Sequence, residues 1–232
     1  RRAHYWKDNL EAPEIIYHPG LKQYYLFTSY DPLMTTYNLR VSRSEAAEGP
    51  FTDYFGKAVK DTTNNFPILT APYRFENHPG WAGTAHCGVF SDGEGNYYLA
   101  HQGRLSPQNQ LMVLHLRQLF FTPEGWPVVS PERYAGTPSR RFTEADLAGE
   151  WEIIRVQEPR YERQLEAGQI LWGEGELKEE EWNLSSRFHL LKDGTCNGEM
   201  VDVEGKFVLA SGKWSFLTEN HLLMLDLGTE KI

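Results

Sequence analysis

Two segments that resemble each other 73 residues apart constrain the fold of this chain more than any other feature. "PEIIYHPGLKQYYLFTS" (13–29) and "HCGVFSDGEGNYYLAHQ" (86–102) each combine an apolar run, a turn containing glycine and the triplet Tyr-Tyr-Leu. A third apolar run and a short polar run follow each of them. A four-stranded antiparallel unit that repeats in this way is typical of the blades of a β-propeller. The alternative is a chance similarity between two hairpins in another kind of β protein.

The rest of the first 134 residues also predicts antiparallel strands. Runs rich in Ile, Val, Tyr and Phe alternate with turns of Gly, Pro, Asn and Asp, and no amphipathic helix pattern precedes residue 140. The expected strands are 14–18, 24–30, 38–44, 86–92, 96–103, 111–121 and 127–133. Residues 62–80 make a long polar connection, which either borders a functional site or is disordered.

A second β series follows a polar stretch with Gly and Pro at 135–149, in which one helical turn is expected. Its β-rich stretches are 150–157, 168–178, 182–194, 195–212 and 213–228, with tight turns expected at 192–194, 203–205 and 218–221. Their alternation and frequent tryptophan favour a small antiparallel barrel or sandwich. The sequence therefore predicts an all-β chain with propeller blades over 1–138 and a barrel-like domain over 149–232.

Charge and composition narrow the classes of partner. The 232 residues carry a net charge of −9 without long runs of Lys or Arg, which argues against nucleic acid as the main partner. No run of eighteen apolar residues occurs, so no membrane-spanning helix is expected, and these residues contain no secretory signal. Cys87 and Cys196 show no metal-ligand spacing, and we expect both to be unpaired.

Two glutamates stand at the start of the first expected strand. Pro13 has no N–H and suits the first position of a strand, and it should hold Ala12 extended. With a period of two, Glu14 would lie on the opposite side of the strand from Glu11. The pattern alone favours two exposed carboxylates. In a propeller, however, Glu11 would face the central cavity.

A family resemblance adds to this pattern. In order, "EAPEIIY", "RVSRSEAAEGPFTD", "GWAGTAHCGVF" and "HQGR" resemble the arabinanases of glycoside hydrolase family 43, over nearly the whole chain. The resemblance implies a five-bladed β-propeller, of which this chain holds about two blades, followed by a C-terminal β-barrel domain. It also implies an extracellular or periplasmic hydrolase that cleaves α-1,5-linked arabinan with inversion.

The resemblance assigns Glu11 as the general acid and leaves Glu14 structural. An acid of this kind protonates the leaving glycosidic oxygen. The general base and a second aspartate, which tunes the acid, should lie upstream, and Asp8 is too close to Glu11 in sequence to be either. We therefore expect the missing blades on the same or a separate polypeptide, and no activity from the isolated chain.

Further site residues come from the same resemblance. His86 should help to hold a calcium ion largely through water, whereas its pattern alone suggests a packed core histidine. The expected sugar-binding residues are Trp81, by stacking, and Gln102, Arg104, Tyr30 and Asp31, by hydrogen bonds. Two other functions stay open, a catalytically silent carbohydrate-binding or assembly module and a xylosidase or arabinofuranosidase of the same family.

Overall fold

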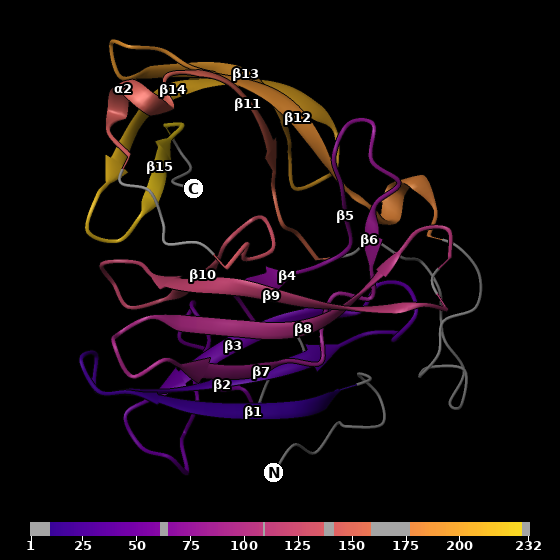
Figure 1. Cartoon of the computed structure of the whole chain (residues 1–232), viewed down its shortest axis with the longest axis vertical. Coiled ribbons are helices and arrows are strands. Elements are labelled where there is room, and N and C mark those ends of the chain that lie inside the picture. The colour runs from indigo at the N-terminus through magenta and orange to yellow at the C-terminus, as the bar shows by residue number, and fades with distance from the viewer. Residues whose placement is uncertain (1–9, 61–64, 109, 137–141, 159–176, 229–232) are drawn as a thin grey trace.

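The computed structural model describes residues 10–60, 65–108, 110–136, 142–158 and 177–228. Their regular secondary structure is almost entirely β-strand (Figure 1). Helical turns are limited, in the described part, to α2 (Glu144–Leu147) and the 3-10 turn Glu179–Glu181. The first of these is the helical turn expected in the linker, and Thr143 and Asp146 cap it reciprocally. None of the described helices is long and apolar enough to cross a membrane.

The first half contains two four-stranded antiparallel units. The first unit pairs in the order β1 (Glu11–His18), β2 (Gln23–Tyr30), β3 (Asn38–Ser44) and β4 (Ile68–Thr70). The second unit pairs β7 (Gly88–Ser91), β8 (Tyr97–Leu105), β9 (Met112–Phe121) and β10 (Pro127–Val129) in the same way. The predicted pair of repeated four-stranded units is therefore present, and its closure into a propeller ring stays a prediction.

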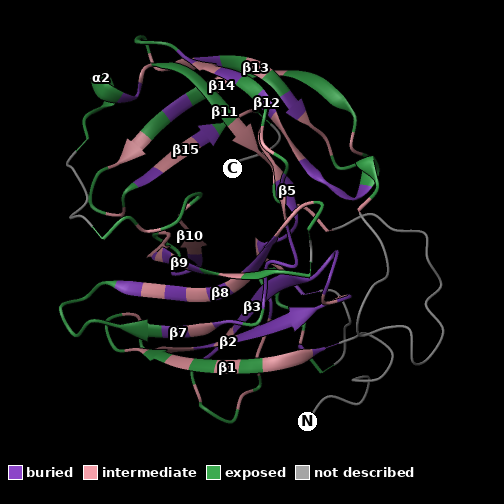
Figure 2. Cartoon of the chain, turned by 45° about the vertical axis from the view of Figure 1, so that its right-hand side comes forward, coloured by how far each residue is buried: buried purple, intermediate pink, exposed green. Residues whose placement is uncertain are grey.

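The two units pack face to face around one apolar core. Tyr25 and Phe27 of β2 meet Leu99 of β8 and Leu119 of β9 there, all of them buried (Figure 2). Along β8 every second side chain from Tyr97 to His101 is buried, as the alternation of a strand requires. At one end of the core, His18 stacks on Tyr97 with ring centroids 4.7 Å apart.

The connection at 62–80 is more structured than expected. Its described part contributes β4 to the first unit and β5 (Tyr73–Arg74), which pairs with β6 (Trp81–Ala82). β6 in turn pairs with β8. These short strands connect the first unit to the second rather than forming a disordered loop.

The second half is an antiparallel sheet of consecutive strands. It comprises β11 (Gly149–Ile154), β12 (Asn183–Leu190), β13 (Thr195–Val201), β14 (Phe207–Leu217) and β15 (Leu222–Asp226). Most of the strand expected at 168–178 lies outside the described residues. Over the described residues no sheet closes into a barrel; the strands arch over the first half instead (Figure 1). The arch has its own core around Phe188, Cys196 and Trp214.

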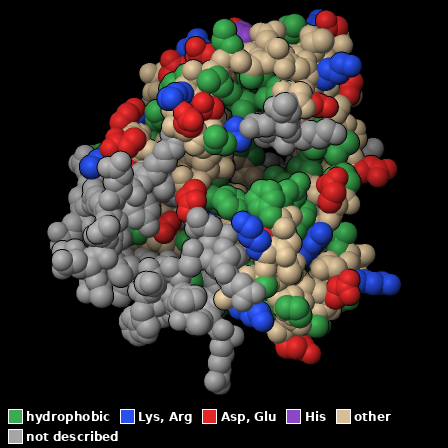
Figure 3. Space-filling view, turned by 180° about the vertical axis from the view of Figure 1, so that it is seen from behind, with side chains coloured by type: hydrophobic (Ala, Val, Ile, Leu, Met, Phe, Trp, Pro, Cys, Tyr) green, Lys and Arg blue, Asp and Glu red, His purple; other side chains and the backbone are tan. Residues whose placement is uncertain are grey.

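A parallel pairing that the sequence did not predict joins the two halves. Tyr73 and Arg74 of β5 pair with Asn183 and Leu184 of β12, so one continuous sheet runs from β10 to β15. The Asn183 amide reinforces this contact by donating to the Pro72 carbonyl over 2.9 Å. From behind, the surface is hollowed between the arch and the lower sheets, with hydrophobic side chains beside the hollow (Figure 3).

Candidate active site

Glu11 opens β1 at an irregularity of the strand. A bulge separates Glu11 from Glu14, and Ala12 between them has φ +48°. The expectation that Pro13 holds Ala12 extended is therefore wrong. A positive φ at a residue with a Cβ costs of the order of 1–3 kcal/mol, so surrounding contacts must hold it in place.

The bulge also places Glu11 and Glu14 on the same side of β1. Glu11 is opposite Ser29 and Glu14 is opposite Phe27, two positions on one face of β2. Because directly opposite residues project to the same side, the prediction that Glu14 lies on the other side of the strand is wrong. The pKa of the Cys87 thiol is raised to about 12, first by burial and then by the charge of Glu14.

The Glu11 carboxylate is held by a buried phenol. The Tyr37 hydroxyl donates a hydrogen bond of 2.5 Å to Glu11 Oε1. Tyr37 is fully buried, and burial, together with the bond to Glu11, raises its pKa, while a bond from Ser29 acts in the opposite direction. The phenol therefore keeps its proton and stays a donor. Glu11 itself is only half-buried, which leaves part of its carboxylate accessible.

His86 lies beside this group, at the start of the second unit. Its backbone N–H donates to Ser29 Oγ over 2.9 Å, and its φ is +56°. Its side chain is exposed, so the alternative of a packed core histidine is wrong. The described residues contain no cluster of three or more His, Cys, Asp or Glu side chains that fits a metal ion.

Gln102 and Arg104 lie on β8 next to the segment that leads to His86. The Gln102 N–H donates to the Ala85 carbonyl over 3.1 Å. Arg104 is buried with its stem against Gly83, where an added Cβ would come within 2.8 Å of Arg104 Cδ. Burial lowers the pKa of Arg104, and the Tyr37 phenol acts against that effect.

Tyr30 and Asp31 belong to a different cluster at the end of β2. The buried Arg40 guanidinium lies 4.4 Å from the centre of the Tyr30 ring and forms an ion pair of 3.9 Å with Asp31. Asp31 also accepts from the Asn38 amide over 2.5 Å. Both side chains are thus engaged in holding the turn between β2 and β3.

Trp81 is likewise packed within the protein. Its ring meets the His115 ring edge-on at 4.4 Å, and the Arg133 guanidinium lies 5.4 Å from its centre. These contacts favour a structural role for Trp81. The structure therefore groups Glu11, His86, Gln102 and Arg104, and leaves Tyr30, Asp31 and Trp81 in other contacts.

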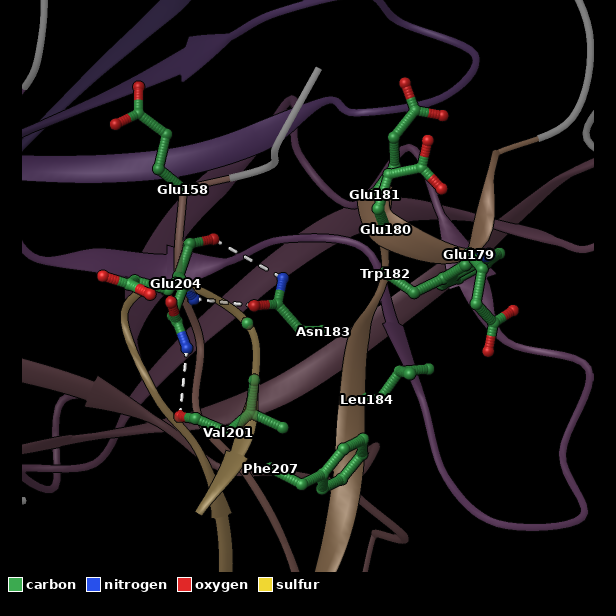
Figure 4. A pocket seen from close by; sticks show the side chains of 12 residues that line it. Glu158, Glu179, Glu180, Glu181, Trp182, Asn183, Leu184, Val201, Glu204 and Phe207 are labelled. Atoms are coloured by element: carbon green, nitrogen blue, oxygen red, sulfur yellow. Dashed lines mark hydrogen bonds between the residues drawn. The ribbon is translucent and has the colours of Figure 1, made fainter. Parts of the chain in front are cut away.

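A separate cavity of about 490 Å³ lies where β12 begins, and none of the predicted site residues lines it. Its lining is acidic, with Glu158, Glu204 and the three glutamates 179–181 (Figure 4). Gln157 also lines it, and its backbone N–H donates to Asn183 Oδ1 over 2.8 Å. The cavity is thus distinct from the Glu11 group.

Comparison with known proteins finds relatives of this chain. Residues 131–232 match the family model GH43_C, described as a C-terminal lipocalin-like domain. The chain is 29% identical over 166 residues to the extracellular endo-α-(1→5)-L-arabinanase 2 of Bacillus subtilis, covering 63% of this chain and 35% of that protein. It is 27% identical over 163 residues to the corresponding enzyme of Thermotoga petrophila, with the same coverage. The resemblance to glycoside hydrolase family 43 is confirmed.

Solved structures agree at the level of the fold. A family 43 glycoside hydrolase of Bacillus licheniformis, YxiA, matches 96% of this chain with a TM-score of 0.73 at 24% identity, and the match covers 47% of that structure. The Thermotoga petrophila endo-1,5-α-L-arabinanase matches equally at 22% identity. This chain spans about a third of the length of the curated family 43 relatives that it matches.

The residues that sequence reasoning missed are Ser29 and Tyr37. Both are of types that often occur in a β core, and their positions carry no motif. The only signal available was the register, since Ser29 is the residue opposite Glu11.

Proposed function

We propose that this chain is the C-terminal part of an extracellular hydrolase of α-1,5-linked arabinan, and that Glu11 is its general acid. The observation that carries the proposal is the setting of Glu11. Its carboxylate is half-buried at the junction of the two units, and it accepts a hydrogen bond from the fully buried Tyr37. The relatives named as endo-arabinanases support the choice of substrate.

In this proposal Glu11 protonates the leaving glycosidic oxygen while a base activates water on the opposite face of the sugar. Inversion requires the two carboxyl groups to be roughly 6.5–9.5 Å apart. The base and the aspartate that tunes the acid belong to the part of the protein that precedes these blades, in line with the greater length of the relatives.

Gln102 and Arg104 are the residues of this chain that we propose for sugar hydroxyl contacts, because Gln102 is bonded to Ala85, next to His86, and the Arg104 stem lies against Gly83. A calcium ion near His86 would supply positive charge that stabilises ionised carboxylates. In this proposal the contacts between His86 and the ion run through water, and no step of the reaction is routed through the ion.

An exo-acting arabinofuranosidase is the second candidate. The chain is 27% identical over 137 residues to the exo-α-(1→5)-L-arabinofuranosidase ArbA of Cellvibrio japonicus, of which it covers 37%. Product analysis separates the two, since endo cleavage of linear arabinan releases a range of oligosaccharides and exo cleavage releases one short product.

The test compares Glu11→Gln with Glu14→Gln in the full-length protein on linear arabinan. Glu11→Gln should lower kcat by about 10²–10⁴-fold, the usual contribution of a positioned acid. Glu14→Gln is the matched control on the same strand and should change kcat little. Full activity of the Glu11→Gln variant would refute the assignment. Hydrolysis that depends on Glu11 in the isolated 232-residue chain would refute the proposal that the general base lies outside this chain.

A further inference from the structure

Hydrogen bonds connect the His86 main chain to Glu11 through two buried side chains. The His86 N–H bonds to Ser29 Oγ over 2.9 Å, Ser29 is bonded to Tyr37, and the Tyr37 hydroxyl bonds to Glu11 Oε1 over 2.5 Å. Ser29 and Tyr37 are both 0% exposed. Water therefore does not compete for these bonds, and a buried network of this kind is strong when each member is satisfied.

The donors in this series all point toward Glu11. A backbone N–H can only donate, so Ser29 Oγ accepts from His86 and has its own proton left for Tyr37. Tyr37 then gives its single proton to Glu11 Oε1. Burial and the bond to Glu11 both raise the pKa of Tyr37, so the phenol does not ionise at ordinary pH.

We propose that Ser29 and Tyr37 are positioning residues, which engage Glu11 Oε1 as an acceptor and so leave Oε2 as the atom that carries the transferable proton. This inference rests on the proposed role of Glu11 as the acid. When Oε2 gives its proton to the leaving oxygen, the electron pair of the O–H bond stays on Glu11, which becomes a carboxylate. The Tyr37 bond is then charge-assisted and stronger than before. It stabilises the transition state more than the bound substrate, which raises kcat rather than affinity.

The main chain around the series supports a positioning role. The series begins at His86 and ends at Glu11, which Ala12 follows. His86 and Ala12 both have a positive φ although neither is glycine, and such residues concentrate at functional sites. Two further backbone bonds hold the Tyr37 segment against the segment before His86: Thr84 N–H to the Tyr37 carbonyl over 3.1 Å, and Gly83 N–H to the Thr35 carbonyl over 2.9 Å. The orientation of the acid on the first unit is thus tied to the second unit.

The first test detects the hydrogen bonds of the series by NMR and does not depend on enzyme activity. In the 232-residue chain, the ¹H–¹⁵N NMR signal of the His86 amide reports its bond to Ser29. Ser29→Ala should shift this signal strongly, and Tyr37→Phe should shift it less but measurably, through the shared bonds. Tyr97→Phe is the matched control, because Tyr97 is another buried tyrosine of the same core, and it should leave the signal in place. An unchanged His86 signal in Tyr37→Phe would overturn the series.

The second test uses the full-length enzyme. Tyr37→Phe keeps the ring in the core and should lower kcat about fivefold to tenfold with little change in KM, the difference between a neutral and a charge-assisted hydrogen bond. Tyr97→Phe should retain the kcat of the parent. If Glu11→Gln abolishes activity but Tyr37→Phe is as active as Tyr97→Phe, the positioning role is refuted and the acid assignment stands. If Glu11→Gln is fully active, the proposed function itself fails, whatever the NMR signal shows.

Discussion

A pair of buried histidines between β8 and β9 should make the stability of this protein sensitive to mild acid. His101 and His115 face each other across the two strands with ring centroids 5.0 Å apart, and they are 1% and 0% exposed. His101 Nδ1 lies 2.6 Å from the Gln102 carbonyl, so this nitrogen donates its proton there. Both ring nitrogens of His115 lack a hydrogen-bond partner among the described residues.

This environment disfavours the charged form of both rings. Burial lowers the pKa of His101 to about 3, and the charges of Arg117 and His115 add to the effect. Burial lowers the pKa of His115 to about 4, with contributions from Arg117 and Arg133. An unfolded histidine has a pKa near 6.5, so below that pH the unfolded chain binds more protons than the folded one. The free energy of unfolding is therefore highest above pH 6.5 and falls as the pH drops toward 4.

The slope is about 1.36 kcal/mol per pH unit for each histidine. At pH 5, each histidine should therefore lower the free energy of unfolding by about 2 kcal/mol relative to pH 7. That is a large part of a typical domain stability of about 5–15 kcal/mol. Urea unfolding of the 232-residue chain at pH 7.5, 6 and 5 measures this loss.

His115→Leu isolates the contribution of one ring. It removes a titrating group without removing a hydrogen bond to a described residue, so the loss between pH 6.5 and 5 should shrink by about 2 kcal/mol. His189→Gln is the control, because the His189 side chain is 42% exposed on β12, and its slope should match the parent. An identical pH dependence in His115→Leu and the parent would refute the argument.

Two further predictions concern the same core. Gly103→Ala should lower the free energy of unfolding by about 1–3 kcal/mol, because a Cβ there would meet His115 Nε2 at 2.6 Å. Gly88→Ala is the control in the same urea assay and should be nearly neutral, because the space around Gly88 is open. A stable Gly103→Ala variant would show that the His115 ring is free to move. Cys87 should resist a thiol reagent such as DTNB in the folded chain at pH 8 and react rapidly in urea, since burial raises its pKa to about 12. Fast labelling without urea would contradict the buried position.

The long strands of the first half could be predicted from sequence because each carries its own signal. The runs "YYLFTSY" and "NYYLAHQG", rich in aromatic residues and bounded by turns, correspond to β2 and β8. The pairing of β5 with β12 had no such signal. Strands of two residues have no periodicity, and their pairing depends on contacts such as Asn183 with Pro72, which are 111 residues apart.

The site was only partly predictable for a similar reason. Glu11 stands in a motif, so the resemblance identified it without geometry. The bulge at Ala12 has no local signal, because alanine has no preference for a positive φ, and one extra residue in a strand reverses an argument from alternation. Ser29 and Tyr37 acquire their importance only from their position opposite and beneath Glu11.

The strain at Ala12 and the hydrogen bond at Glu11 are best understood together. A positive φ at alanine costs of the order of 1–3 kcal/mol, and a hydrogen bond to a charged group contributes about 1.5–3 kcal/mol. The two quantities are similar, so the bond from Tyr37 is strong enough to offset the strain of the bulge that aims Glu11. Tyr37 is held in turn by the core that both four-stranded units share. The conformation of Glu11 is therefore a property of the two packed units, which neither "EAP" nor either unit alone would specify.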